Sequence, residues 1–203
     1  MSGEKRDSKG MERKDEELIA SFQQGDATAF DELYSRYKKP IFNFTLRILN
    51  NRADAEDVTA EVFMKLFEKK DYYQPQNAKF STWLFAIAYN GAISRTRSRR
   101  NTVSMWFNRP DGEEARRDIP SQEPSTQAVL IQREETQQVR SVIVKLPSLQ
   151  KEALILREYH RFSYQEIAQI MNCSLEQVKV LIFRAREFLR QELPTLNAED
   201  KNV

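Results

Sequence analysis

Two helix-start signatures lie eleven residues apart within residues 163–179, "SYQEIAQIMNCSLEQVK". Ser163 is followed three residues later by Glu166, and Ser174 is followed by Gln177. In such a capping box the serine oxygen accepts from the third backbone N–H of the helix, and the Glu or Gln side chain accepts from the serine N–H. The stretch predicts a helix of about eight residues, a short turn and a longer helix, which is the layout of a helix-turn-helix.

The second helix of this pair is predicted to carry several cations among its exposed positions. They are Lys179, Arg184, Arg186 and Arg190. A helix N-terminus can bind phosphate through its free N–H groups and its dipole, while side chains in the first turns reach base edges. The pattern indicates DNA binding, and a small helical bundle with a basic solvated face is the alternative.

Composition favours an all-α protein of one large or two small domains, because the 203 residues include only 5 Gly and 7 Pro and helix-forming residues dominate. The net charge of +2 hides an uneven distribution. No acidic residue occurs from Tyr72 to Pro110, and seven acids follow between Asp111 and Glu135. The chain therefore has a basic block followed by an acidic one.

Low cysteine and histidine counts exclude several classes of site. The single Cys173 rules out an intramolecular disulfide, and with the single His160 it argues against a metal centre, so no cofactor is expected. Cys173 is expected to fill space in the turn, and His160 to lie at the end of a surface helix. The charged N-terminus shows no secretory signal, and "WLFAIAY" is too short to cross a bilayer, so we expect no membrane insertion and a cytoplasmic location.

Periodicity and turn residues predict two small helical domains joined by a flexible linker, the second of them containing the helix-turn-helix. The expected boundaries are a disordered tail at 1–14, a helical domain at 15–100, an acidic linker rich in Pro and Ser at 101–126, a helical domain at 127–193, and a C-terminal tail at 194–203.

The predicted helix "DAEDVTAEVFMKLFEKK" has an apolar face and an acidic face. The acidic face comprises Asp54, Asp57, Glu61 and Glu68, with Lys65 among them. Clustered carboxylates repel one another weakly, so such a row is either solvated or the docking site of a basic partner. Metal or acid–base chemistry would require convergence with further groups in a pocket, and no suitable His motif is present.

Aromatic residues precede a cluster of arginines in the segment from Tyr72 to Arg100. Rings that stack on exposed bases, combined with cations that follow the backbone, suit single-stranded nucleic acid. The alternative is a buried helix face, which Trp83, Ile87 and Ala88 also fit.

Taken together, four segments resemble a sigma factor of RNA polymerase from the extracytoplasmic-function (ECF) group of the sigma-70 family. In order, they resemble the group's first conserved segment, its polymerase-binding helix, its −10-element reader and its −35-element reader. The segments are "LIASFQQGDATAFDELYSRY", "DAEDVTAEVF", "FSTWLFAIAYNGAISRTRSRR" and "LPSLQKEALILREYHRFSYQEIAQIMNCSLEQVKVLIFRAREFL".

The resemblance implies a promoter-specificity subunit without catalysis of its own, which binds core polymerase at the β′ clamp coiled coil and the β flap, binds promoter DNA, and is held inactive by an anti-sigma factor. Implied polymerase contacts are Asp54, Asp57, Glu61 and Lys65. For the −10 element, the resemblance implies that Asn90 reads a flipped base. The loop implied to support this base contains Gln76, Asn77, Lys79 and Phe80, and Trp83 would lie near the site of strand opening. The implied phosphate contacts are Arg95, Arg97, Arg99 and Arg100. Implied −35 contacts are Ser174, Glu176, Gln177, Lys179, Arg184 and Arg186.

The chain departs from the family pattern in the −35 reader. Where the family often has a small polar residue and an arginine, this chain has Val180 and Leu181, and "LEQ" stands at 175–177 in place of "VGT". Contacts at those positions do not transfer. A stand-alone helix-turn-helix regulator and a helical hydrolase or nuclease are the rival functions; the regulator leaves the acidic helix without a role, and the enzyme lacks a converging constellation.

Overall fold

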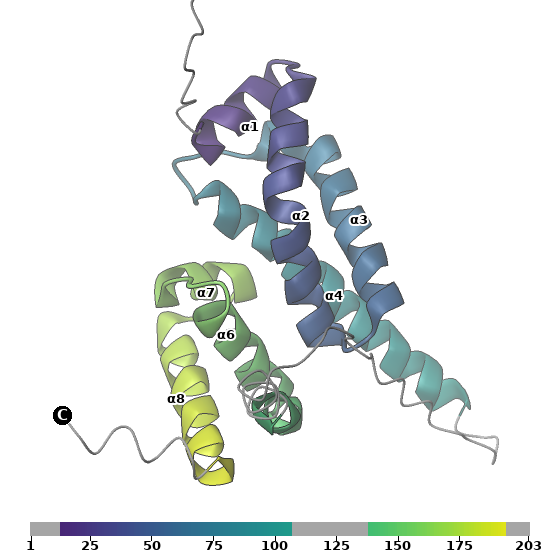
Figure 1. Ribbon diagram of the computed structural model, residues 1–203, viewed down its shortest axis with the longest axis vertical. Helices are drawn as coiled ribbons and strands as arrows, with labels where there is room; N and C mark the ends of the chain where they lie inside the picture. The colour runs from purple at the N-terminus through teal and green to yellow at the C-terminus, as the bar shows by residue number, and fades with distance from the viewer. Residues whose placement is uncertain (1–12, 107–137, 194–203) are drawn as a thin grey trace, which may run out of the picture.

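The computed structural model describes residues 13–106 and 138–193, and every regular element in these ranges is helical (Figure 1). The all-α prediction, with two helical regions and a helix-turn-helix in the second, is confirmed. Residues 1–12, 107–137 and 194–203 lie outside the described part, so most of the expected N-terminal tail, the C-terminal tail, most of the expected linker and the start of the second expected domain are not covered. Residues 101–106, at the start of the expected linker, are helical.

The N-terminal module, residues 13–106, contains four α-helices and one turn of 3-10 helix. They are α1 (Asp15–Gln23), α2 (Ala27–Leu49), α3 (Arg52–Lys69), η1 (Lys70–Tyr72) and α4 (Phe80–Trp106). Asp26 caps α2 by accepting from the Thr28 N–H at 2.9 Å, and Asn51 caps α3 by accepting from the Asp54 N–H at 3.0 Å. Asn50, between α2 and α3, has a left-handed φ of 48°, so α3 turns back along α2.

The core of this module lies between α2, α3 and α4, and its largest fully buried side chains include Phe44, Phe80 and Leu66. The ring of Phe80 packs edge-on against Tyr37 and Tyr73, with centroids 5.4 and 5.7 Å away. A Cβ on Gly91 would lie 3.0 Å from Cγ1 of Val58. Glycine therefore lets the backbone of α4 approach α3 closely, which fixes the two helices side by side.

The C-terminal module, residues 138–193, begins with a helical segment at 138–145 and continues with α6 (Ser148–Glu158), α7 (Tyr164–Met171) and α8 (Leu175–Glu192). Both predicted capping boxes are present. Ser163 and Ser174 each accept from the third N–H of the helix they start, and their own N–H groups donate to Glu166 at 2.8 Å and Gln177 at 2.9 Å. Asn172, with φ of 50°, makes the turn between α7 and α8.

The two modules pack against each other, α7 on α4 and α6 on α2 (Figure 1). One buried apolar cluster includes side chains of both. Phe85 of α4 contacts His160 and Phe162, with ring centroids 4.8 and 4.9 Å away. Tyr89 of α4 donates a buried hydrogen bond of 3.0 Å to Glu152 of α6. The described modules are thus closed on each other.

His160 lies at this interface, so the expectation of a surface position is wrong. Its ring is half-buried between Phe44 and Phe85, and its Nε2 atom has no hydrogen-bond partner among the described residues. Burial, followed by the positive charge of Arg47, lowers the pKa of His160 to about 4. The side chain therefore packs as a neutral ring. Cys173, in contrast, packs partly buried against the core, as a space-filling residue should.

Candidate nucleic-acid and polymerase interfaces

Asp54, Asp57 and Glu61 form an acidic stripe along an outer face of α3. Asp57 and Glu61 are exposed, and Asp54 is half-buried. The opposite face of the helix buries Ala55, Val58, Val62 and Leu66 in the core, as the sequence pattern predicts. Lys65 is half-buried on the same helix. The carboxylates are therefore accessible to a basic partner.

Two arginines of α4 already contact the acidic stripe. Arg95 lies 3.3 Å from Asp57, 3.4 Å from Glu61 and 3.9 Å from Asp54, and Arg99 lies 3.1 Å from Asp54. The family resemblance implies that the arginines contact DNA and the carboxylates contact polymerase. The structure brings the two sets together along the seam between α3 and α4.

Two exposed apolar side chains next to the stripe were missed by sequence reasoning. Met64 and Phe67 are 62% and 61% exposed. Both fall outside the apolar face of α3, and that position in an amphipathic helix was the signal that could have identified them. Exposed apolar groups beside charged ones are typical of a protein-docking surface.

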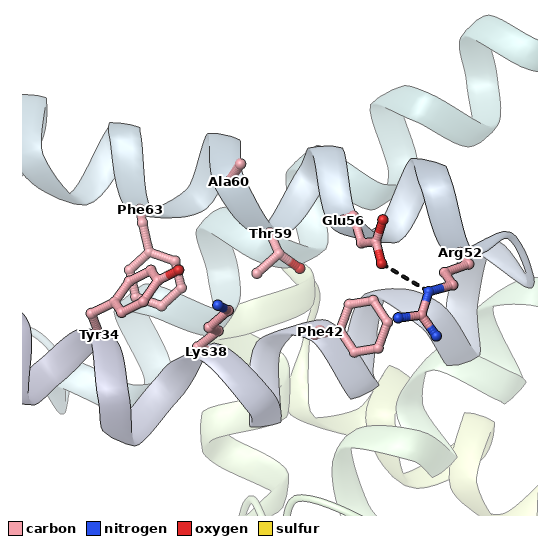
Figure 2. Close-up of a pocket in the computed structure, with 8 residues that line it drawn as sticks. All are labelled: Tyr34, Lys38, Phe42, Arg52, Glu56, Thr59, Ala60 and Phe63. Carbon is pink, nitrogen blue, oxygen red and sulfur yellow. Dashed lines mark hydrogen bonds and ion pairs between the residues drawn. The ribbon is translucent and has the colours of Figure 1, made fainter.

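A surface groove of about 380 Å³ lies between α2 and α3 (Figure 2). Tyr34, Lys38 and Phe42 of α2 line one side. The residues from α3 are Arg52, Glu56, Thr59, Ala60 and Phe63. The Arg52–Glu56 ion pair of 2.8 Å closes one end, and Tyr34 and Phe63 pack at 4.7 Å at the other. Ala60 lies one helical turn before Met64, so groove and apolar pair share one side of α3.

The loop before α4 holds the residues predicted to support a flipped base. Gln76 and Asn77 are exposed, and Asn77 donates to the Gln74 side chain at 3.1 Å. The Tyr73 hydroxyl donates to the Ala78 carbonyl at 3.1 Å, which braces the loop; burial, followed by the charge of Glu16, raises the pKa of Tyr73 to about 12. The phenol therefore remains a donor at neutral pH.

Two members of the predicted base-supporting set are not free in this structure. Phe80 is fully buried, so it stabilises the loop from the core side and presents no ring surface for a base. Lys79 forms an ion pair of 2.9 Å with Glu166 of α7, although its side chain remains largely exposed. Burial opposes ionisation of Glu166, but the Ser163 N–H and Lys79 outweigh it and lower the Glu166 pKa.

One face of α4 carries Trp83, Asn90 and Arg97, which recur every seven residues. Asn90 and Arg97 are exposed, whereas Trp83 is half-buried and packs against Tyr73 at 5.4 Å. Arg97 makes no ion pair with the described residues. The structure thus separates Arg97 from Arg95 and Arg99, which face α3, and the side chain of Arg100 lies outside the described set.

In α8 the predicted −35 residues fall into three groups. Ser174 is engaged as the helix cap, and Arg186 pairs with Glu158 of α6 at 2.8 Å. The remaining four are exposed along the first three turns: Glu176, Gln177, Lys179 and Arg184. Of these, Gln177 is also engaged in the cap, because its Oε1 accepts from the Ser174 N–H at 2.9 Å. Val180 and Phe183 are exposed between them, and sequence reasoning did not assign them a role.

Neither a metal centre nor a membrane helix occurs in the described ranges. No three His, Cys, Asp or Glu side chains of residues 13–106 and 138–193 converge on a metal position. Nor does any helix in those ranges have the length and hydropathy needed to cross a bilayer.

Comparison with protein families identifies both modules. The model described as "Sigma-70 region 2" matches residues 33–102, and "Sigma-70, region 4" matches residues 136–189. The chain belongs to the sigma-70 family of RNA polymerase sigma factors. Region 2 corresponds to the module with the acidic stripe, and region 4 to the module with the helix-turn-helix.

Full-length relatives refine this assignment. RNA polymerase sigma-H factor of Pseudomonas aeruginosa is 32% identical over 197 residues, covering 93% of this chain and 98% of the relative. ECF RNA polymerase sigma-E factor of Escherichia coli K12 is 33% identical, covering 90% and 95%. ECF RNA polymerase sigma factor SigW of Bacillus subtilis is 29% identical, covering 92% and 100%. The protein is a sigma factor of the ECF group, a non-catalytic subunit that acts in transcription initiation.

Solved structures agree with this fold. The sigma factor RpoE, in its complex with the anti-sigma factor NepR from Bartonella quintana, aligns with a TM-score of 0.66 at 25% identity, covering 81% of this chain and 96% of that one. CnrH, solved with the cytosolic domain of CnrY, aligns with a TM-score of 0.62 at 23% identity over 90% and 96%. The family assignment removes the repressor and enzyme alternatives.

Proposed function

We propose that α3 docks this sigma factor on core polymerase through the acidic stripe and its apolar neighbours, Met64 and Phe67. The observation that carries the proposal is that carboxylates and exposed apolar groups occupy one accessible side of a helix whose other side is core. The partner is the basic coiled coil of the β′ clamp, with Lys65 at the edge of the contact. The C-terminal module contacts the β flap.

The face of α4 with Trp83, Asn90 and Arg97 captures the non-template strand of the −10 element. Asn90 reads a base turned out of the duplex, the loop with Gln76, Asn77 and Lys79 holds it, and Phe80 supports that loop from the core. Unstacking a base costs a few kcal/mol, and a pocket for that base offsets part of the cost. Arg97 and Arg100 contact phosphates, and Arg95 and Arg99 do so after leaving the carboxylates of the acidic stripe.

Helix α8 enters the major groove of the −35 element. In this proposal Glu176, Gln177 and Lys179 of its first turns meet base edges, Ser174 holds the N-terminus, and Arg184 and Arg186 contact phosphates. Neither module need bind tightly alone, because attachment of both to polymerase raises their effective concentration at the promoter.

An anti-sigma factor is the proposed inhibitor. Support comes from the neighbours solved as complexes, such as RpoE with NepR. The proposed compartment is the bacterial cytoplasm, where RNA polymerase and the chromosome are located. No cofactor is proposed.

Transcription with purified core polymerase and a genomic DNA library tests this function. Start sites that appear only when the protein is added, and that share two sequence elements, are the expected result and would give both elements. Failure of the protein to co-elute with core, together with tight binding to duplex DNA by the protein alone, would contradict the docking proposal.

A further inference from the structure

Two large apolar side chains are exposed on the face of α8 that is proposed to meet DNA. Val180 is 46% exposed and Phe183 is 66% exposed, whereas Val178 and Ile182 on the other side of the helix are buried. Residues three apart share a helix face. The two side chains thus form one apolar strip in the second and third turns of α8.

Charged side chains border this strip. At 100° per residue, Lys179 lies on one flank and Arg184 on the other, and both are exposed. Glu176, also exposed, lies one turn before Val180. A strip with cations along both edges matches the major groove, in which two phosphate backbones flank the base edges.

We propose that Val180 and Phe183 read thymine methyl groups in the −35 element. The inference rests on the proposed role of α8 as the −35 reader. The thymine C5-methyl is the apolar group that a base pair presents in the major groove, and apolar side chains recognise it by contact. Glu176, one turn earlier, suits the amino group of a cytosine beside these thymines.

A protein surface is the competing use of the same residues. Val180 also lines a hollow of about 400 Å³ together with Leu149 and Met171, which an apolar side chain of a partner could fill. Phe183, the more exposed of the pair, does not line that hollow. The cations on both flanks complement phosphates, so DNA is the occupant that the charges favour.

The test uses holoenzyme and the −35 element found by core-dependent transcription. Each thymine is replaced singly by deoxyuridine, which removes only the methyl group. At one or two positions we expect initiation to fall about fourfold, the effect of losing one buried methyl-sized contact. Phe183→Ser should abolish this discrimination at one position and Val180→Ser at another. Val144→Ser, the same change at an exposed valine outside α8, should retain both.

Each other outcome overturns the inference. Unchanged initiation with deoxyuridine, while other base changes at the same positions impair it, would refute methyl reading and leave the proposed function intact. Discrimination that persists in both serine variants would assign it to other residues. Variants that read the −35 element normally but escape an anti-sigma factor would identify a protein surface. No core-dependent initiation from the unsubstituted promoter would remove the proposed function and this inference with it. Circular dichroism melts check that the variants fold.

Discussion

Asn90 projects from an exposed face of α4, so its side chain can be removed without disturbing the core. We expect Asn90→Ala to reduce discrimination at one −10 base by about tenfold or more, because a good side-chain contact to a base edge is worth about 1–3 kcal/mol. Initiation from templates that vary at each −10 position measures this. Ser94→Ala, one turn further along the same face, is the control. Equal loss at every position would show that Asn90 does not read a base.

His160 should make stability depend on pH. Its pKa is about 4 in the folded protein and about 6.5 when unfolded, so between these values the unfolded chain binds more protons. The part of the free energy of unfolding that depends on a neutral His160 is fully present above pH ~6.5 and is lost as the pH falls towards ~4. Urea unfolding at pH 7.5 and pH 5 should show a lower midpoint at pH 5.

His160→Gln should reduce that difference between the two midpoints. The comparison reports on His160 because the chain contains 1 histidine and ordinary carboxylates are mostly ionised at pH 5. If the variant shows the same fall as the parent, another group is responsible.

Residues whose roles depend on local pattern were predictable, and residues whose roles depend on tertiary packing were not. The acidic stripe follows from helical periodicity alone. In contrast, the burial of Phe80 and His160 results from contacts with residues far away in sequence, such as Tyr37 and Phe44. The exposure of Phe183 belongs with the predictable features, because it lies off the face of α8 that buries Val178, Ile182 and Ala185.

At the scale of single helices, α3 and α8 each support a prediction. Reversing the charge of the acidic stripe with Asp57→Arg and Glu61→Arg should abolish co-elution with core polymerase, because a basic partner would then meet cations. The control exchanges Arg52 and Glu56 at the start of α3, off the acidic stripe. This exchange keeps their ion pair in reversed order and leaves the net charge unchanged, so co-elution should be unchanged. Retained co-elution of the reversed stripe would place the polymerase contact elsewhere.

The cap of α8 should contribute measurably to stability. Ser174 accepts from the Gln177 N–H at 3.2 Å, and we expect Ser174→Ala to cost about 1 kcal/mol. That corresponds to a fall in melting temperature of about 2–4 °C for a protein of this size. Ser148→Ala, at an exposed position where α6 starts without a side-chain cap, should change the melting temperature less. Equal shifts in melting temperature for the two variants would show that the Ser174 cap does not stabilise α8 specifically.

The capped helix starts were predictable, since caps are local signals. The end of α4 was not, because the helix continues to Trp106, beyond the expected boundary at residue 100. Both serine caps are found where the sequence places them. The packing of α7 on α4 had no such signal. It depends on matching apolar surfaces, which one sequence does not reveal.

For the whole molecule, the closed packing of the modules should be incompatible with binding both promoter elements. The −10 and −35 elements are about 25 base pairs apart, or about 85 Å of duplex, whereas Lys79 and Glu166 are joined at 2.9 Å. Lys79→Cys and Glu166→Cys, in a Cys173→Ala background, can be joined by a short cleavable cross-linker. We expect the joined factor to be inactive in transcription and to recover on cleavage.

Modification of the single variant Glu166→Cys with the same reagent controls for chemical damage. Full activity of the joined factor would mean that the modules read a promoter without separating.

The shared apolar cluster also affects how the protein can be dissected. Phe85 and Tyr89 are covered by the C-terminal module, and Phe162 is buried in the interface from the other side. In a fragment ending near residue 106, the apolar surface around Phe85 and Tyr89 would be exposed to water. We expect such half-proteins to aggregate, or to be rescued by mixing the two halves, rather than to behave as two independent proteins.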